Sequence, residues 1–393
     1  MAYDPVVAAL FSRGTSRFEG VYEPGLANLC EYDVSLLMHV LLEETDPGAR
    51  AFWVGRLLDD GADPRVGLAD GYGVFHALCA NKILAPDVDA GLMRRLIGCG
   101  ADVNQLSKRE GYPLQVLITR TNVTDDFLMP IYEVFLEQPD LDVLLVDRFG
   151  VGVLEQARMW YPHHPRLAVL LEDYARAHGQ EVERPLWFLA LAGSYDEFVA
   201  GYSPDRVNEV TRDRTLLMEA MRNPDAAARA RIARRLIADG ADVNYAHPRY
   251  GVGAVNLLVQ APDLGSQENL ALFRELLAAG VDPNAEDGST GRPLGYIAGA
   301  RKRKKKPELD LSGYYEVLLA RDDLELLDPG RHGRSVLDDV RSRDDQSDGL
   351  LDALIGWLVS HGLEVPPPQS NLKASARRRN SGRKKPQQKQ QKQ

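Results

Sequence analysis

A short apolar phrase recurs nine times along this chain at a nearly constant spacing. Each copy has an apolar residue, two intervening positions, and then a second apolar or small residue. The nine pairs are Leu37/Val40, Phe75/Leu78, Leu114/Leu117, Leu154/Ala157, Leu186/Leu189, Leu217/Ala220, Val255/Leu258, Leu294/Ile297 and Leu337/Val340. Successive copies are separated by 38, 39, 40, 32, 31, 38, 39 and 43 residues. Self-similarity at such a period predicts stacked repeat units rather than one globular core.

A second apolar doublet follows each pair, and in the clearest copies a glycine stands three positions beyond it. These doublets are Leu57-Leu58, Leu96-Ile97, Leu236-Ile237, Leu276-Leu277 and Leu358-Val359, before Gly61, Gly100, Gly240, Gly280 and Gly362. A glycine in that place is typical of the left-handed residue that ends many helices. Each unit is therefore predicted to hold two short helices and then a polar loop. Helices this short are not stable alone, so each unit must pack on its neighbours.

The residues around those glycines resemble the ankyrin-repeat family. Residues 100–104 and 240–244 both read Gly-Ala-Asp-Val-Asn, which is similar to the family consensus after the second helix. Residues 215–220 keep the threonine, leucine and alanine of the signature Thr-Pro-Leu-His-x-Ala, and His76 keeps its histidine. Over residues 30–368 the resemblance implies an all-α fold, an ankyrin-like solenoid of about nine helix–turn–helix repeats with polar fingers.

The spacing departs from that family, whose period is near 33 residues. We expect the surplus between the two helices of a repeat, in residues 81–90, 120–126, 222–228, 260–267 and 299–312. The two short steps flank Leu186, where residues 191–195 resemble the family's ordinary tight turn. The long linkers either form a second surface or reflect neutral variation in loop length, which costs little stability. The sequence leaves both interpretations open.

Charge is distributed unevenly along the chain. Of the 47 basic residues nine lie in residues 370–393, so the rest of the chain has 38 basic residues against 57 acidic ones and a formal charge of about −19. The basic end lacks apolar periodicity, which predicts disorder. We therefore expect an N-terminal cap segment over residues 1–29, the repeat region over 30–368 and a disordered basic tail over 369–393. A second basic segment lies in the linker of the eighth repeat: Arg301, Lys302, Arg303, Lys304, Lys305 and Lys306.

Motifs for catalysis and for cofactors are missing from the sequence. It has no phosphate-binding Gly-Lys-Ser/Thr loop, no His-Glu-x-x-His, no Cys-x-x-Cys and no Gly-x-Ser-x-Gly. His163 and His164, between prolines, are interpreted as surface-loop histidines, and His76 as structural. We expect no catalytic residue, no metal and no cofactor, hence no enzyme. The sequence also shows no apolar run that could span a membrane and no secretory leader. With three scattered cysteines this favours a cytoplasmic protein, or a nuclear one if the chain is eukaryotic.

The leading functional hypothesis is a protein-binding scaffold or adaptor, because stacked repeats form an extended concave surface. Another protein, of unknown identity, would bind the concave face and the fingertips, which are the tips of the polar loops that precede the first helices. The alternative is association with nucleic acid or ribosomes through the basic tail and the 301–306 segment, since such segments supply salt-dependent phosphate affinity. Against it, the acidic body would repel a polyanion.

Cationic and aromatic residues recur in the loops that precede each first helix, and stacking would line them up along one edge. The candidate partner-binding residues are Arg65, Tyr72, Lys108, Arg109, Tyr112, Arg148, Phe149, Arg212, Arg214, Arg249, Tyr250, Arg292 and Arg331. They would form a basic ridge that docks an acidic segment of a partner. In the alternative interpretation they are ordinary solvated residues, neutralised by neighbours such as Asp70, Glu110, Asp147 and Asp213.

Removing the basic tail should not affect folding. A chain that ends after Pro368 should keep the melting temperature of the full chain, because the tail lacks the apolar residues needed to join a core. Thermal unfolding followed by circular dichroism measures this. A lower melting temperature for the shortened chain would show that the tail packs on the repeats.

Overall fold

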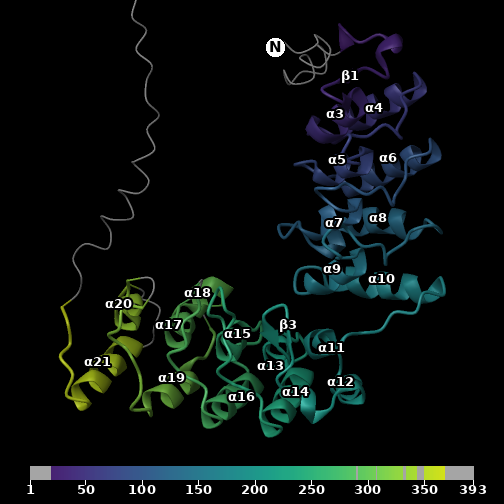
Figure 1. Ribbon diagram of the computed structural model, residues 1–393. Helices are drawn as coiled ribbons and strands as arrows, with labels where there is room; N and C mark the ends of the chain where they lie inside the picture. Colours follow the sequence, from purple (N-terminus) through teal and green to yellow (C-terminus); the bar gives the residue numbers. More distant parts are fainter. Residues whose placement is uncertain (1–18, 289–290, 307, 331–332, 343–348, 368–393) are drawn as a thin grey trace, which may run out of the picture. The chain divides into compact units, whose positions relative to one another are not determined.

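The computed structural model describes residues 19–288, 291–306, 308–330, 333–342 and 349–367, without the side chain of Lys302 (Figure 1). The chain divides into two compact units, Met1–Glu183 and Arg184–Gln393, and each is considered by itself below. This division was not among the expected boundaries. The predicted tail lies outside the described residues, as does most of the predicted N-terminal cap segment.

The first unit is a stack of helix pairs. Its first helices pack on one another in chain order, α3 on α5, α5 on α7 and α7 on α9, and its second helices do the same from α4 to α10. The helices are α3 (Leu36–Glu43), α4 (Pro47–Asp59), α5 (Val74–Ala80), α6 (Pro86–Gly98), α7 (Pro113–Ile118), α8 (Asp125–Leu136), α9 (Val153–Met159) and α10 (Pro165–Ala177). The stack therefore has two layers, with the loops extending from the helix ends (Figure 1).

The second unit repeats this plan. Its first helices form the series α11, α13, α15, α17 and α20, and its second helices the series α12, α14, α16, α19 and α21. The helices are α11 (Leu186–Ala192), α12 (Tyr195–Gly201), α13 (Leu216–Met221), α14 (Ala226–Ala238), α15 (Ala254–Gln260), α16 (Gln267–Ala278), α17 (Pro293–Ala298), α18 (Ala300–Lys304), α19 (Ser312–Leu319), α20 (Val336–Arg341) and α21 (Leu350–Ser360). The predicted all-α solenoid of stacked helix pairs is confirmed.

The apolar pairs of the sequence form the core of the first layer. Each of the nine pairs lies in a first helix, and none of the eighteen side chains is more than 9% exposed. The predicted helix stops also hold. Gly240 has a φ of 91°, and the amides of Gly240 and Ala241 donate to the carbonyls of Ile237 and Leu236 at 3.1 and 3.0 Å. These bonds satisfy carbonyls at the end of α14 that would otherwise lack a partner.

The long repeat period has a different source from the one expected. Helix α6 begins at Pro86, so half of the predicted linker 81–90 is helical. The second helices α6 and α14 have 13 residues, whereas α12, in the repeat with the short period, has seven. Much of the surplus therefore lengthens the second helix. Among the linkers that the structure describes in full or nearly so, the eighth repeat has the longest, and it contains α18.

Asparagine side chains in two linkers bond to the end of the first helix of the preceding repeat. The buried Asn81 amide donates to the carbonyls of Leu41 and Glu44 at 2.8 and 3.0 Å. Asn223 occupies the same place in the second unit and donates to the carbonyls of Ala190 and Gly193 at 3.1 and 3.0 Å. These side chains satisfy carbonyls at helix ends across a repeat boundary, so this part of the linkers is structural.

The two units also share features that the sequence analysis did not anticipate. A short hairpin precedes α3 (β1, Cys30–Glu31; β2, Val34–Ser35), and another precedes α13 (β3, Val210–Thr211; β4, Arg214–Thr215), 180 residues later. A 3-10 turn comes before each, η1 (Pro24–Leu26) and η2 (Pro204–Arg206).

A buried arginine follows each hairpin, at the second helix of the same repeat. Arg50 donates to Asp89 at 2.7 Å and to the Glu44 carbonyl at 2.7 Å, and Arg229 bonds in the same way to Asp263 and the Asn223 carbonyl. The second unit thus reproduces these contacts of the first.

Asparagines join successive repeats beside the fingers. Asn244 donates to the Gly280 carbonyl at 2.9 Å and accepts from the Asp282 amide at 2.8 Å, which pairs it with the next turn in both directions. The same two-way contact is made by Asn28, Asn104, Asn208 and Asn284. Arg65 stands at the equivalent position after Gly61 but bonds Asp63 of its own turn at 2.8 Å.

Replacing Asn244 with alanine should destabilise the second unit by about 1–2 kcal/mol, because two backbone groups of the next repeat lose their partner. Arg65→Ala is the matched control, since it removes only an exposed ion pair and should change stability by less than about 0.5 kcal/mol. Chemical unfolding of the full chain measures both. Equal stability of the two variants would show that the asparagine contact does not couple repeats.

Candidate protein interface at the fingertips

Backbone hydrogen bonds fix the finger loops that precede the first helices. Ser107 pairs with Gly111 in one finger, and neighbouring fingertips are joined by the Lys108 amide, which donates to the Asp70 carbonyl at 2.7 Å. Gly71 shows how close they are, because a Cβ there would lie 2.0 Å from the Leu106 carbonyl oxygen, and its φ is 91°. These loops therefore hold their side chains at defined positions.

In the first unit, two fingertips present cations. Lys108 and Arg109 are exposed on the finger before α7, and the Arg109 guanidinium is 3.7 Å from Glu110. Arg148 lies on the finger before α9, with its guanidinium carbon 4.4 Å from the ring centroid of Phe149. Phe149 is 69% exposed, the largest value among the exposed hydrophobic side chains of the described residues. Cation–π contact orders the guanidinium but leaves its donors available.

The acidic side chains near these fingertips do not pair with every cation there. Asp147 accepts the amides of Phe149 and Val151 at 2.8 and 3.0 Å and so shapes the turn. Within the described part of the chain, neither Arg148 nor Arg249 forms an ion pair. The interpretation of the ridge as locally neutralised surface therefore fits Arg109 better than it fits Arg148.

The second unit has a similar fingertip before α15. Arg249 lies 5.3 Å from the ring centroid of Tyr250, which is 48% exposed. Two other predicted residues belong to the hairpin before α13. Arg212 lies over the ring of Trp187 at 4.5 Å, and Arg214 is 3.8 Å from Glu219. Partial burial lowers the pKa of both guanidinium groups from the usual value.

The side chains of three predicted residues bond to other residues of the repeats. Arg292 is only 9% exposed and bonds the Glu325 carbonyl and the carboxylates of Glu325 and Asp328. Tyr112 is 6% exposed and donates to the Val146 carbonyl at 3.3 Å. Arg65 pairs with Asp63, as described above. A further candidate, Arg331, lies outside the described residues.

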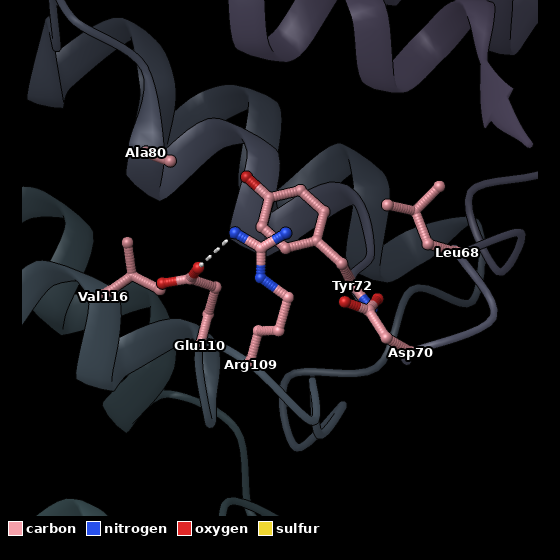
Figure 2. A pocket seen from close by; sticks show the side chains of 7 residues that line it. All are labelled: Leu68, Asp70, Tyr72, Ala80, Arg109, Glu110 and Val116. Carbon is pink, nitrogen blue, oxygen red and sulfur yellow. Dashed lines mark hydrogen bonds and ion pairs between the residues drawn. The ribbon is translucent and has the colours of Figure 1, made fainter. Parts of the chain in front are cut away.

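A cavity of about 310 Å³ lies beside the first of these fingertips (Figure 2). It is lined by Leu68, Asp70, Tyr72, Ala80, Arg109, Glu110 and Val116. Figure 2 shows the Arg109 guanidinium between the Glu110 carboxylate and the Tyr72 ring. Tyr72 stacks on His76 at 5.1 Å, and burial raises the pKa of its phenol to about 12, so it stays neutral at physiological pH. The sequence could not show this cavity, because its walls come from two successive repeats.

Histidines in this stack are structural. His76 Nδ1 accepts the Gly73 amide at 3.1 Å, and its Nε2 lies 2.9 Å from the Gly111 carbonyl, so it connects two repeats as expected. The interpretation of His164 as a surface-loop residue is wrong. It is 0% exposed and its Nδ1 is 2.9 Å from Asp125, because Asp125 reaches into this linker to accept the Arg166 amide at the start of α10.

The basic segment is partly built into the second unit. Arg301 donates to the Leu309 carbonyl at 2.7 Å, and Lys304 donates to the Ala261 carbonyl at 2.6 Å. Arg303 lies over the Tyr296 ring at 3.9 Å, whereas Lys305 and Lys306 are exposed. Burial lowers the pKa of Lys304 from its usual value. Two of these cations therefore fasten the long linker rather than face a polyanion.

The described residues contain neither a metal-binding cluster nor a membrane-spanning helix. No group of three or more histidine, cysteine or acidic side chains there could hold a metal ion. No helix in that part of the chain has the length and apolar character needed to cross a membrane.

Comparison with known proteins adds little to these observations. No protein-family model matches the chain, and no curated protein matches it either. Among solved structures, a functionally unknown protein from Leptotrichia buccalis C-1013-b is 19% identical, with a TM-score of 0.37, over 46% of this chain and 96% of that one. The ankyrin repeat domain of Bcl-3, a member of the IkappaB family, is 16% identical, with a TM-score of 0.26, over 66% of this chain and 91% of that one. Similarities this distant carry no functional argument, so the fold rests on the contacts described above.

Lys304→Ala should destabilise the second unit by about 1 kcal/mol, because buried linker carbonyls lose a charged donor. Lys306→Ala, two residues further on and exposed, should have almost no effect and serves as the control. Thermal unfolding compares the two. A melting temperature that is the same for both variants would mean that the segment is not fastened by Lys304.

Proposed function

We propose that this chain is a protein-binding scaffold or adaptor whose fingertips dock an acidic segment of another protein. The observation that carries the proposal is the pair of neighbouring tips with Lys108, Arg109 and Arg148 beside the exposed ring of Phe149. On a body with a formal charge of about −19, they form a local basic surface. Such a surface selects acidic partners by electrostatic complementarity and speeds their association.

The geometry of the tips favours recognition of carboxylates. A guanidinium stacked on a ring keeps its planar edge for bidentate bonds to a carboxylate. The ring of Phe149 offers an aromatic anchor of the kind found at the centres of interfaces. Because the fingers are fixed by backbone bonds, little conformational entropy is lost on binding. Arg249 and Tyr250 supply the same combination in the second unit.

A non-catalytic role in the cytoplasm, or in the nucleus of a eukaryote, is part of this proposal. The alternative, association with nucleic acid or ribosomes, is left with the exposed cations Arg303, Lys305 and Lys306 in the described residues. Arg301 and Lys304 of the basic segment are directed to backbone carbonyls, and the tail lies outside the structure. We therefore propose protein binding alone.

Reversing Arg148 and Arg249 to glutamate should weaken binding of the partner at least about tenfold, because attractive contacts become repulsive. The partner is first identified by affinity capture from the native cell and mass spectrometry, and its affinity is then measured by calorimetry. Both substituted residues are exposed and form no ion pair in the described structure, so the melting temperature should not change.

The matched control reverses one exposed cation in each unit away from the fingers, Lys82→Glu and Arg274→Glu. It changes the net charge equally and should leave the affinity within about twofold, since distant surface charges are screened by salt. Undiminished affinity of the Arg148/Arg249 variant would place the binding surface elsewhere, first on the linkers between the helices of a repeat.

A further inference from the structure

A second cavity, of about 470 Å³, opens beside the fingers before α15 and α17. Its walls include Asn244, Tyr245, Gly253, Val281, Asp282 and Ala285. All of them belong to the second unit and to two successive repeats.

The first unit has an equivalent space beside Gly73, but the side chain of Gln105 fills it. Gly73 and Gly253 correspond, because each precedes a first helix and donates its amide to the third residue of that helix, His76 at 3.1 Å and Asn256 at 2.9 Å. The Gln105 amide lies against Gly73 so closely that a Cβ there would be 1.9 Å from Gln105 Oε1. In the second unit the residue that corresponds to Gln105 is Ala285.

Ala285 is the smallest residue at this position of the repeat. It comes five positions after the helix-ending glycine, where the other repeats with the same turn have Val66, Gln105 and Tyr245. In the first unit Gln105 occupies the space between the finger and Gly73. At Ala285 the equivalent space is left open at the surface of the stack.

The lining of the cavity is acidic. It contains the carboxylates of Asp282 and Glu286 and, among the described lining residues, neither lysine nor arginine. Asp282 accepts the Asn284 amide at 2.8 Å, and the Glu286 carboxylate lies beside Gly330, where a Cβ would be 2.9 Å away. The exposed carboxylate of Asp282 adds negative potential next to the opening, which favours a cationic occupant.

We propose that this cavity receives an arginine side chain of the partner protein. The inference rests on the proposed function, since it supplies a further contact for a partner segment docked at the Arg249 fingertip of the same unit. A planar guanidinium would take the place that the planar amide of Gln105 takes in the first unit, with the Tyr245 side chain as one wall. Arginine fits better than lysine because it combines charge with a flat group that packs against backbone and rings. The partner segment would then carry an arginine near its acidic residues.

The first test needs no partner. Three alanines line the cavity, Ala246, Ala254 and Ala285, so the full chain labelled at its alanine methyl groups reports on it by NMR. The probe is the peptide acetyl-Gly-Arg-Gly-amide, with acetyl-Gly-Gln-Gly-amide and acetyl-Gly-Glu-Gly-amide for comparison. We expect the arginine peptide to shift these three methyl signals, the glutamine peptide to shift them less, and the glutamate peptide to leave them unchanged.

Ala285→Gln should abolish the shifts at Ala246 and Ala254, because it rebuilds the filled site of the first unit. Ala279→Gln, which adds the same side chain at an exposed position at the end of α16, is the matched control and should leave them intact. The melting temperature of both variants should equal that of the parent chain. Signals that do not move, that move equally with all three peptides, or that still move after Ala285→Gln would overturn the proposal.

Affinity for the captured partner separates this inference from the proposed function. Ala285→Gln should lower that affinity at least about tenfold, the equivalent of one charge-assisted contact. If Ala285→Gln has no effect while the Arg148/Arg249 reversal does, the cavity is not used and the fingertip proposal stands. If only Ala285→Gln weakens binding, the cavity is a docking site and the fingertips are not.

Discussion

Both stacks depend on the two-way hydrogen bond that an asparagine makes to the next repeat. Their first helices have only six to eight residues and cannot be stable in isolation. Apolar burial between helices supplies the driving force, but it is non-directional and does not fix the distance from one turn to the next. Asn244, with a donor and an acceptor on one rigid group, fixes that distance at 2.9 and 2.8 Å. The fingers before α7 and α15 begin directly after Asn104 and Asn244, so the positions of Arg109 and Arg249 follow from this contact. The Arg148 finger begins after Leu144 instead, in a turn that Asn104 of the preceding repeat holds through Asp140 and Asp142.

Much of the fold could be predicted from the sequence, because its signals are local and repeated. The apolar pairs located every first helix, and the glycines located the ends of second helices such as α14. The length of the second helices was not predicted, since Pro86 reads as a linker residue until its helix packs. The division near residue 183 was not predicted either. Its signs are matching contacts in the two units, those of Arg50 and Arg229, and each of these joins residues more than thirty positions apart in the sequence.

The candidate site was predicted in position but not in detail. Register placed Arg148 and Arg249 at fingertips, and both are exposed there. The same register predicted that Arg292 and Tyr112 would bind a partner, but the following repeat buries both side chains. His164 was interpreted as a surface-loop histidine and Lys304 as one cation of a basic segment. His164 is buried and Lys304 bonds to the Ala261 carbonyl, because burial depends on which neighbouring element packs against a residue. The cavity beside Ala285 could not be predicted from the sequence, because it is recognised only by comparison with the first unit, where the Gln105 side chain fills the equivalent space.

The most direct test of the account is hydrogen–deuterium exchange of the full chain, measured by mass spectrometry with and without the captured partner. Fingers that dock the partner should exchange more slowly in the complex than in the free chain, where backbone hydrogen bonds already protect part of them. The account predicts added protection over residues 105–112, 145–152 and 245–253, and no change in the linkers 81–85 and 222–225. Protection confined to those linkers, with the fingers unaffected, would contradict it and show that the partner binds the opposite ends of the helices.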